Sequence, residues 1–144
     1  MTRRTTLSLC LALLALCAAP LNTAIAQSTA AAHKLVMQVS DNDPAKWDLA
    51  LNNARNVQTE LGKDSVDIEI VAYGPGINML KLDSVVGGRV SEAVKAGVKV
   101  VACEITMRNQ NVKRDDMLTD IGYVDSGVVE LMRRQRQGYA YVRP

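Results

Sequence analysis

The sequence predicts one α/β domain in which a mostly parallel sheet of about five strands lies between helices on both faces. Two observations predict this class. Short apolar segments alternate with longer segments whose apolar residues recur at helical spacing, and short glycine-containing turns join them. The apolar segment 98–102 is hydrophobic at nearly every position, as expected for a strand covered on both faces. We find no internal repeat and no second domain.

The first 26 residues have the pattern of an export signal. The pair Arg3-Arg4 precedes an apolar stretch over 7–19, which is too short to span a bilayer well. The tripeptide Ala24-Ile25-Ala26 has the small-x-small form of a cleavage site. We therefore expect a Sec-type signal peptide that is cleaved after Ala26, and a periplasmic or secreted protein. The expected divisions are a signal peptide over 1–26, a flexible lead over 27–33 and one domain over 34–144.

Charge and size limit the classes of partner. The formal net charge is +2, and loss of Arg3 and Arg4 leaves 2 − 2 = 0. A neutral domain has no field that attracts nucleic acid or an anionic membrane, so we expect neither partner and no membrane span after cleavage. The remaining chain, about 118 residues long, is large enough for its own hydrophobic core.

The first half of the domain predicts two strands and a long helix. The segment 33–40 is the first strand. Asp43 and Pro44 mark a helix start, as N-cap and first helical residue, and Gly62 marks its end. The residues at helical spacing between them are Trp47, Ala50, Leu51, Ala54, Val57 and Leu61. The second strand is expected over 66–73, where the Gly74-Pro75-Gly76 turn ends it.

The second half repeats the alternation. We expect a helical turn over 77–82 and a helix over 84–96, then the buried strand 98–102 and a polar helical stretch after Cys103. A short strand follows over 122–124. Ser126 is expected to cap a helix over 127–137, with Val128, Leu131 and Met132 facing inward. The last strand is expected over 139–142.

Ligands of parallel sheets bind outside the carboxyl ends of the strands. Three loops of this chain meet that edge, namely 40–43, 73–76 and 103–106. The third loop places Cys103 at a strand tip before an expected helix, where backbone amides stabilise a thiolate. Position alone leaves two interpretations open: a nucleophile, or a small hydrophobic residue of the core. Glu104 opposes thiolate formation unless it points away.

Cysteine counting makes Cys103 distinctive. The chain has three cysteines, and Cys10 and Cys17 both lie in the expected signal peptide. Cys103 therefore has no partner for an internal disulfide in the mature chain. With one such cysteine and a single histidine, His33, expected at the opposite edge of the sheet, we expect neither a metal site nor a Cys-His pair.

Other candidate groups have a structural and a functional interpretation. Asp41 and Asp43 cap a helix, bind a cation or act as an acid and a base. Gly74 to Gly76 form a tight turn or let a ligand or another chain approach the backbone. The helix interior, where asparagine is disfavoured, contains Asn52, Asn53 and Asn56. They are plain surface residues or form hydrogen bonds to a neighbouring loop or subunit. Basic residues near the C-terminus form a solvated face or attract an anion: Lys113, Arg114, Arg133, Arg134 and Arg136.

Four segments together resemble the DsrE/DsrF-like (intracellular sulfur oxidation) family over about 34–144. They are "LNNARNV", "VAYGPGI", "VVACEITM" and "GVVELMRRQRQGYAYVRP". The resemblance implies a three-layer α/β/α domain that assembles into homo-trimers or homo-hexamers. It also implies that Cys103 accepts sulfane sulfur as a persulfide and passes it to a partner thiol, without a metal or an organic cofactor. The members that relay sulfur are cytoplasmic, whereas this chain carries an export signal.

These observations predict an exported sulfur carrier or sulfurtransferase-like protein. Cys103 is its expected nucleophile, with a donor or acceptor protein as partner. The expected pocket residues are Tyr73, Gly74, Pro75, Gly76, Asn53, Glu104 and Thr106. The rival hypothesis is a non-catalytic oligomeric module that binds a small ligand or a protein, with an inert buried cysteine. A redox protein that forms an intermolecular disulfide is the third, although the mature chain has no resolving cysteine.

Overall fold

The computed structural model describes residues 33–144. The expected signal peptide over 1–26 and nearly all of the expected lead lie outside the described residues. Within 33–144, no helix is both long enough and apolar enough to cross a membrane.

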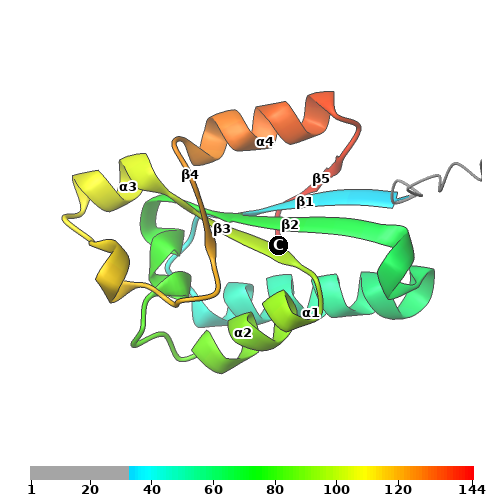
Figure 1. The fold of residues 1–144 in the computed structure, drawn as a ribbon, viewed down its shortest axis with the longest axis horizontal. Helices are drawn as coiled ribbons and strands as arrows, with labels where there is room; N and C mark the ends of the chain where they lie inside the picture. Colours follow the sequence, from blue (N-terminus) through cyan, green and yellow to red (C-terminus); the bar gives the residue numbers. More distant parts are fainter. Residues whose placement is uncertain (1–32) are drawn as a thin grey trace, which may run out of the picture.

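A five-stranded sheet, parallel throughout, forms the centre of the domain (Figure 1). Its strand order is β4-β3-β2-β1-β5, and every neighbouring pair is parallel. The sequence predicted a mostly parallel sheet of about this size. The strands are β1 (His33–Val39), β2 (Val66–Ala72), β3 (Lys99–Cys103), β4 (Gly122–Val124) and β5 (Ala140–Val142).

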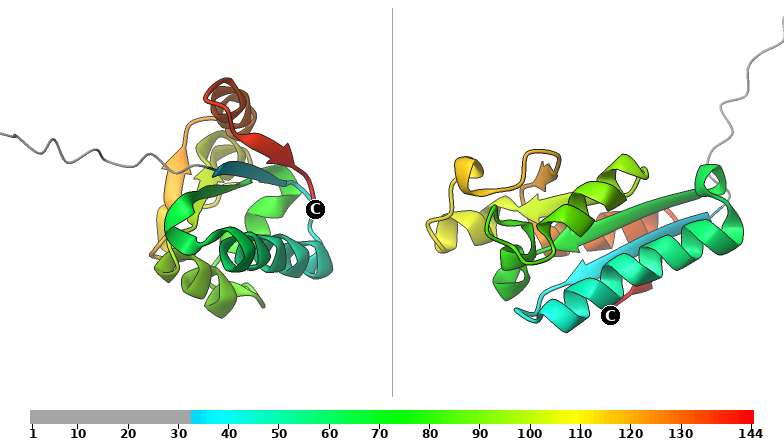
Figure 2. Two further views of the ribbon diagram at one scale, coloured as in Figure 1. Left: turned by 90° about the vertical axis from the view of Figure 1, so that its right-hand side faces the viewer. Right: turned by 90° about the horizontal axis from the view of Figure 1, so that it is seen from below.

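Helices cover both faces of the sheet, which confirms the predicted three-layer class (Figure 2). The helices α1 (Pro44–Leu61) and α2 (Gly87–Lys95) pack on one face, and α4 (Gly127–Arg136) packs on the other. The short helix α3 (Glu104–Asn109) continues directly from the carboxyl end of β3. Three 3₁₀ segments complete the chain: η1 (Lys63–Ser65), η2 (Gly74–Leu80) and η3 (Arg114–Asp116).

Local signals set the ends of α1 as the sequence predicted. The Asp43 carboxylate accepts a hydrogen bond from the Ala45 amide at 2.9 Å, which satisfies one of the free donors of the first turn. Pro44 occupies the first turn, where its missing N–H costs nothing. Gly62 follows the last residue with a φ of +87°, a conformation that glycine adopts without a steric penalty.

The two faces of the sheet differ in how they are packed. The α1–α2 face holds the large aliphatic core, in which Met37, Ile70 and Leu80 are fully buried. The α4 face holds a small cluster made by Val36, Val71, Leu131 and Tyr139. Alternate residues of a strand point to opposite faces, so Cys103 points to the same face as Val101, which packs against the small cluster. Cys103 thus lies on the α4 face.

Two details of the sequence prediction for α4 are wrong. Val128 and Met132 of α4 are 50% and 49% exposed, and Leu131 is the large apolar side chain of that helix that is buried. Charged residues take the inward positions instead, because Glu130 is buried beside Arg134. Ser126 precedes α4, but its side chain makes no capping hydrogen bond.

Candidate functional site

Cys103 lies where two helices begin. It is the last residue of β3 and directly precedes α3. Its neighbour in the sheet is Val124, the last residue of β4, and the chain then passes through Asp125 and Ser126 into α4. The Ile105 amide donates to the Asp125 carbonyl at 3.1 Å, which ties the start of α3 to the loop before α4. The cysteine is a free thiol and is 4% exposed.

Hydrogen bonds around the sulfur favour its ionised form. Burial raises the pKa of the Cys103 thiol, since a charge is poorly solvated away from water. Hydrogen bonds from the Thr106 hydroxyl and from the backbone amides of Gly127, Thr106 and Ile105 lower the pKa. Together they outweigh burial and hold the pKa of Cys103 below its ordinary value. A protonated thiol has a weaker alternative, a 4.0 Å contact with the Asp125 carbonyl.

Thr106 joins two of the three predicted loops. Its hydroxyl oxygen accepts a hydrogen bond from the Gly74 amide at 2.9 Å. The hydroxyl proton is then free to donate to the Cys103 sulfur. A second contact between the same loops runs from the Gln110 side-chain amide to the Gly74 carbonyl at 3.2 Å. The structure therefore brings Cys103, Thr106 and Gly74 together, as expected for loops at one edge of a parallel sheet.

The turn 74–76 is glycine-containing because the backbone passes close to other segments. Gly74 has a φ of +53°. A side chain on Gly76 would place its Cβ 2.3 Å from the Val39 carbonyl oxygen at the end of β1. Tyr73, just before the turn, packs against Gly127 so closely that a Cβ there would lie 2.9 Å from the Tyr73 Cβ. Pro75 is exposed in the first turn of η2.

Glu104 is directed away from the thiol. Its carboxylate accepts a hydrogen bond from Arg114 and lies 3.9 Å from Arg108. Arg114 also lies over the Tyr123 ring, 4.2 Å from its centroid, so the ring faces a cation that Glu104 already neutralises. The largest influences on the pKa of Cys103 are burial and the hydrogen bonds from Thr106, Gly127 and Ile105. The expected conflict between this carboxylate and a thiolate is resolved by the ion pair with Arg114.

Several candidate residues lie elsewhere. Asn53 belongs to α1, which packs on the face opposite to Cys103, so it is not brought to the thiol. His33 begins β1 and lies at the amino edge of the sheet, as predicted. Asp43 is a helix cap, and the Lys46 ammonium beside Asp41 holds the pKa of that carboxyl below its usual range. Within residues 33–144 no group of three His, Cys, Asp or Glu residues could hold a metal ion.

The basic cluster expected near the C-terminus does not act as one surface. Arg114 pairs with Glu104 beside α3. On α4, Arg134 lies 2.5 Å from the fully buried Glu69 carboxylate and 2.8 Å from Glu130. Arg134 is thus part of the packing between α4 and the sheet and not of a solvated face. Arg133, in contrast, is an exposed partner of Glu130.

Sequence reasoning missed a fourth loop at the carboxyl edge, 125–127. Its Gly127 supplies an amide to the Cys103 sulfur and the close contact with Tyr73. The signal was available, because β4 was expected over 122–124 and the segment after any parallel strand meets the same edge. The loop was overlooked because β4 has only three residues.

Comparisons with known proteins agree with this architecture. The family model described as "DsrE/DsrF-like family" matches residues 33–144. A solved protein of unknown function from Methanobacterium thermoautotrophicum is 39% identical, with a TM-score of 0.74; the match covers 78% of this chain and 99% of that one. A conserved protein of unknown function from Bacteroides thetaiotaomicron shares the fold at 16% identity and a TM-score of 0.63, over 77% of this chain and 94% of that one. No protein with a curated description matches. The chain belongs to the DsrE/DsrF-like family, which is linked to sulfur relay.

Proposed function

We propose that this protein is a periplasmic sulfur carrier that holds sulfane sulfur on Cys103 as a persulfide and passes it to a partner. The observation that carries the proposal is the position of the thiol, between the starts of α3 and α4, where amides and the Thr106 hydroxyl lower its pKa. Membership of a family linked to sulfur relay supports the same role. A thiolate is the form that attacks sulfur, so the surroundings match the chemistry.

The transfer needs no oxidant and no cofactor. The Cys103 thiolate attacks the terminal sulfur of a donor persulfide, so that a new S–S bond forms while the donor's S–S bond breaks. The donor leaves as a thiolate, and Cys103 carries the persulfide. An acceptor thiolate then attacks the outer sulfur, and Cys103 leaves as the thiolate with which it began. The same amides that favour the thiolate also favour its departure, because a thiol of lower pKa is a better leaving group.

We further propose export by the N-terminal signal, cleavage after Ala26 and assembly into a homo-oligomer, either a trimer or a hexamer. The pattern of 1–26 supports export. Fractionation of cells that produce the full chain should place the protein in the periplasm with Gln27 as its first residue. A cytoplasmic protein that keeps Met1 would contradict export and leave the chemistry of Cys103 to be tested separately.

The experiment for the sulfur role is intact mass spectrometry after incubation with inorganic polysulfide. We expect a gain of one sulfur atom that is removed by a small thiol and is absent in Cys103→Ser. Peptide mapping assigns the sulfur to its residue, since any uncleaved chain also contains Cys10 and Cys17. Ser126→Ala is a suitable control, because the Ser126 side chain makes no capping bond. It should accept sulfur as the wild type does.

A second candidate is a non-catalytic oligomeric binding module with an inert cysteine. The 4% exposure of Cys103 favours it, because a donor must reach a nearly covered sulfur. In that case the native protein resists both polysulfide and small alkylating reagents, and Cys103→Ala behaves as the wild type. Reaction of the native thiol with either reagent would exclude this candidate.

A further inference from the structure

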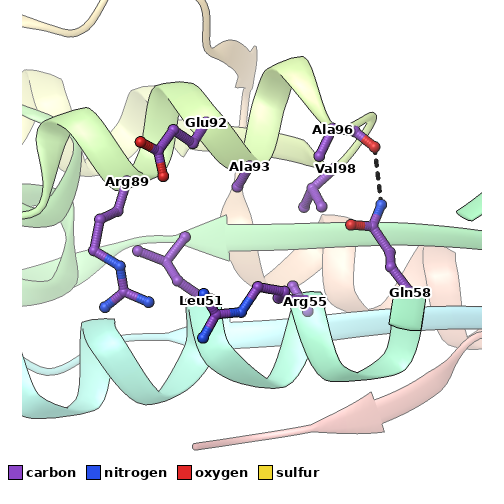
Figure 3. Close-up of a pocket in the computed structure, with 9 residues that line it drawn as sticks. Leu51, Arg55, Gln58, Arg89, Glu92, Ala93, Ala96 and Val98 are labelled. Atoms are coloured by element: carbon purple, nitrogen blue, oxygen red, sulfur yellow. Dashed lines mark hydrogen bonds between the residues drawn. The ribbon is translucent and has the colours of Figure 1, made fainter. Parts of the chain in front are cut away.

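The helices α1 and α2 enclose a groove on the face of the domain opposite to Cys103. Its volume is about 190 Å³ (Figure 3). The floor is apolar and is formed by Leu51, Ala54, Ala93 and Val98. Gln58 spans one end, where its side-chain amide donates to the Ala96 carbonyl at 2.9 Å. The groove is therefore closed at one end and apolar below, and its other walls are charged.

Two guanidinium groups gather on one asparagine at the groove. The Asn52 side-chain oxygen accepts a hydrogen bond from Arg55 at 3.2 Å and from Arg89 at 2.8 Å. Arg89 also pairs with Asp48. Arg55 has no ion pair with any of residues 33–144, so its charge is not neutralised by the fold. The side chain of Asn52 thus positions two arginine side chains beside the apolar floor of the groove.

A carboxylate stands on the other wall. Glu92 of α2 lines the same groove, is exposed, and takes part in none of the ion pairs within the described part of the chain. One groove thus carries an uncompensated cation on α1 and an uncompensated anion on α2. Glu92 would repel a purely anionic ligand, and Arg55 would repel a purely cationic one. A ligand that carries both charges would satisfy both walls.

We propose that the α1–α2 groove binds a free amino acid with an aliphatic side chain. Its carboxylate faces Arg55, its ammonium faces Glu92, and its side chain covers the apolar floor. Guanidinium groups suit a carboxylate because their N–H groups match its two oxygens. The volume is below the roughly 300 Å³ at which drug-sized pockets begin, which fits a molecule of this size. The site is independent of the proposed sulfur chemistry.

The test is a titration of the isotope-labelled protein with L-leucine, followed by nuclear magnetic resonance. Isocaproate, which is leucine without its ammonium, and isoamylamine, which is leucine without its carboxylate, serve as probes of each charge. We expect saturable shifts in α1, α2 and the start of β3, and affinities at least about tenfold weaker for both analogues. Absence of a saturable shift, or isocaproate binding as tightly as leucine, would overturn the proposal.

Variants assign each contact. Glu92→Gln should remove the advantage of leucine over isocaproate, and Arg55→Gln should remove its advantage over isoamylamine. Both side chains are on the surface, so neither variant threatens the fold. Ala93→Leu fills the floor and should abolish binding of all three probes. Arg108→Gln, on the exposed side of α3, is the control and should bind leucine as the wild type does. Unchanged leucine affinity in both Arg55→Gln and Glu92→Gln would place any binding elsewhere.

Discussion

At the scale of single residues, Thr106 is the link between the turn after β2 and the thiol. Its hydroxyl is held by the Gly74 amide, so the direction of its proton is set by the backbone of another loop. A serine retains the hydroxyl at this position, whereas a valine retains only the shape. The pair of substitutions therefore separates the hydrogen bond from the packing of the side chain.

We predict that Thr106→Val raises the pKa of Cys103, because the variant loses a donor that stabilises the thiolate. Thr106→Ser should keep the wild-type value. The thiolate's ultraviolet absorbance, followed against pH, measures this without requiring a reagent to reach the sulfur. Thr106→Val should also lower the free energy of unfolding by about 1–3 kcal/mol, since the Gly74 amide loses its partner. An unchanged titration in Thr106→Val would show that the hydroxyl does not act on the thiol.

Two glycines give a matched test of close packing. We predict that Gly76→Ala destabilises the fold by more than about 3 kcal/mol, because its Cβ would lie 2.3 Å from a backbone oxygen of β1 that cannot move aside. Gly88→Ala meets no atom within 4 Å and lies in α2, so it should stabilise the fold by about 0.5–1 kcal/mol. Chemical denaturation measures both. Equal effects of the two changes would contradict the close approach of η2 to β1.

At the scale of elements, α4 is attached to the sheet largely through charge. Leu131 reaches the small cluster, and Arg134 bridges Glu69 of β2 and Glu130 of its own helix. Neither oxygen of Glu69 has a well-aligned hydrogen-bond donor within 33–144, so this contact is mainly electrostatic. Burial raises the pKa of Glu69 despite the attraction of Arg134. The helix α4, whose Gly127 amide contacts the thiol, therefore packs on the Glu69 carboxylate, whose charge Arg134 compensates only in part.

The Glu69 shift predicts a pH dependence of stability. A carboxyl with a raised folded pKa contributes stability that is fully present below its unfolded pKa and is lost as the pH rises through the folded value. The free energy of unfolding of the wild type minus that of Glu69→Gln should therefore fall as the pH rises from about 4 towards neutrality. Each unit of pKa shift corresponds to about 1.4 kcal/mol.

Denaturation curves at a series of pH values measure this difference. Glu60→Gln is the matched control, because it removes the same charge from the exposed surface of α1. Subtracting its effect corrects for the general loss of one negative charge. A difference that rises with pH, as for the lowered pKa of Asp67, would contradict the assignment.

Local signals were sufficient for most elements and for half of the site. Asp43, Pro44 and Gly62 act through their own backbone, so the bounds of α1 could be predicted from the sequence. Cys103 and Gly74 could be placed together because parallel strands present their carboxyl ends at one edge. Asn53 could not be excluded, since nothing local says which face of the sheet α1 covers. The direction of Glu104 depends on Arg114, which lies beyond the end of α3.

The prediction of which residues of α4 face inward was wrong for a different reason. The prediction assumed that apolar periodicity points to the core, which holds when a helix covers a broad apolar surface. Here β2 presents the carboxylate Glu69 to α4, and a cation is its natural partner. Val128 and Met132 were therefore assigned to the core while they lie on the surface. The available signal was the pair of carboxylates at alternate positions of this strand, Asp67 and Glu69.

At the scale of the whole molecule, α4 carries an exposed apolar stripe formed by Val128, Val129 and Met132. These side chains lie at spacings that place them on neighbouring positions of the helix surface. Such a stripe is the kind of surface that a subunit contact covers, and it is consistent with the proposed homo-oligomer. The stripe also begins in the first turn of α4, close to the loop that meets Cys103.

We predict that Met132→Glu weakens self-association, because it places a charge within a surface that is buried on assembly. Light scattering coupled to size exclusion should show a trimer or hexamer for the wild type and a smaller species for the variant. Arg136→Glu, one turn further along α4, changes charge beyond the stripe and should leave the mass unchanged. A monomeric wild type, or equal masses in all three proteins, would contradict assembly through α4.

The strand order has a consequence for synthesis. β5, which is translated last, pairs with β1, which is translated first among the five strands. Until residues 140–142 have left the ribosome, β1 remains an edge strand with one row of unpaired backbone groups. A chain of this topology therefore cannot complete its sheet until β5 has been synthesised, and any product that stops before β5 keeps an unpaired edge open to other strands.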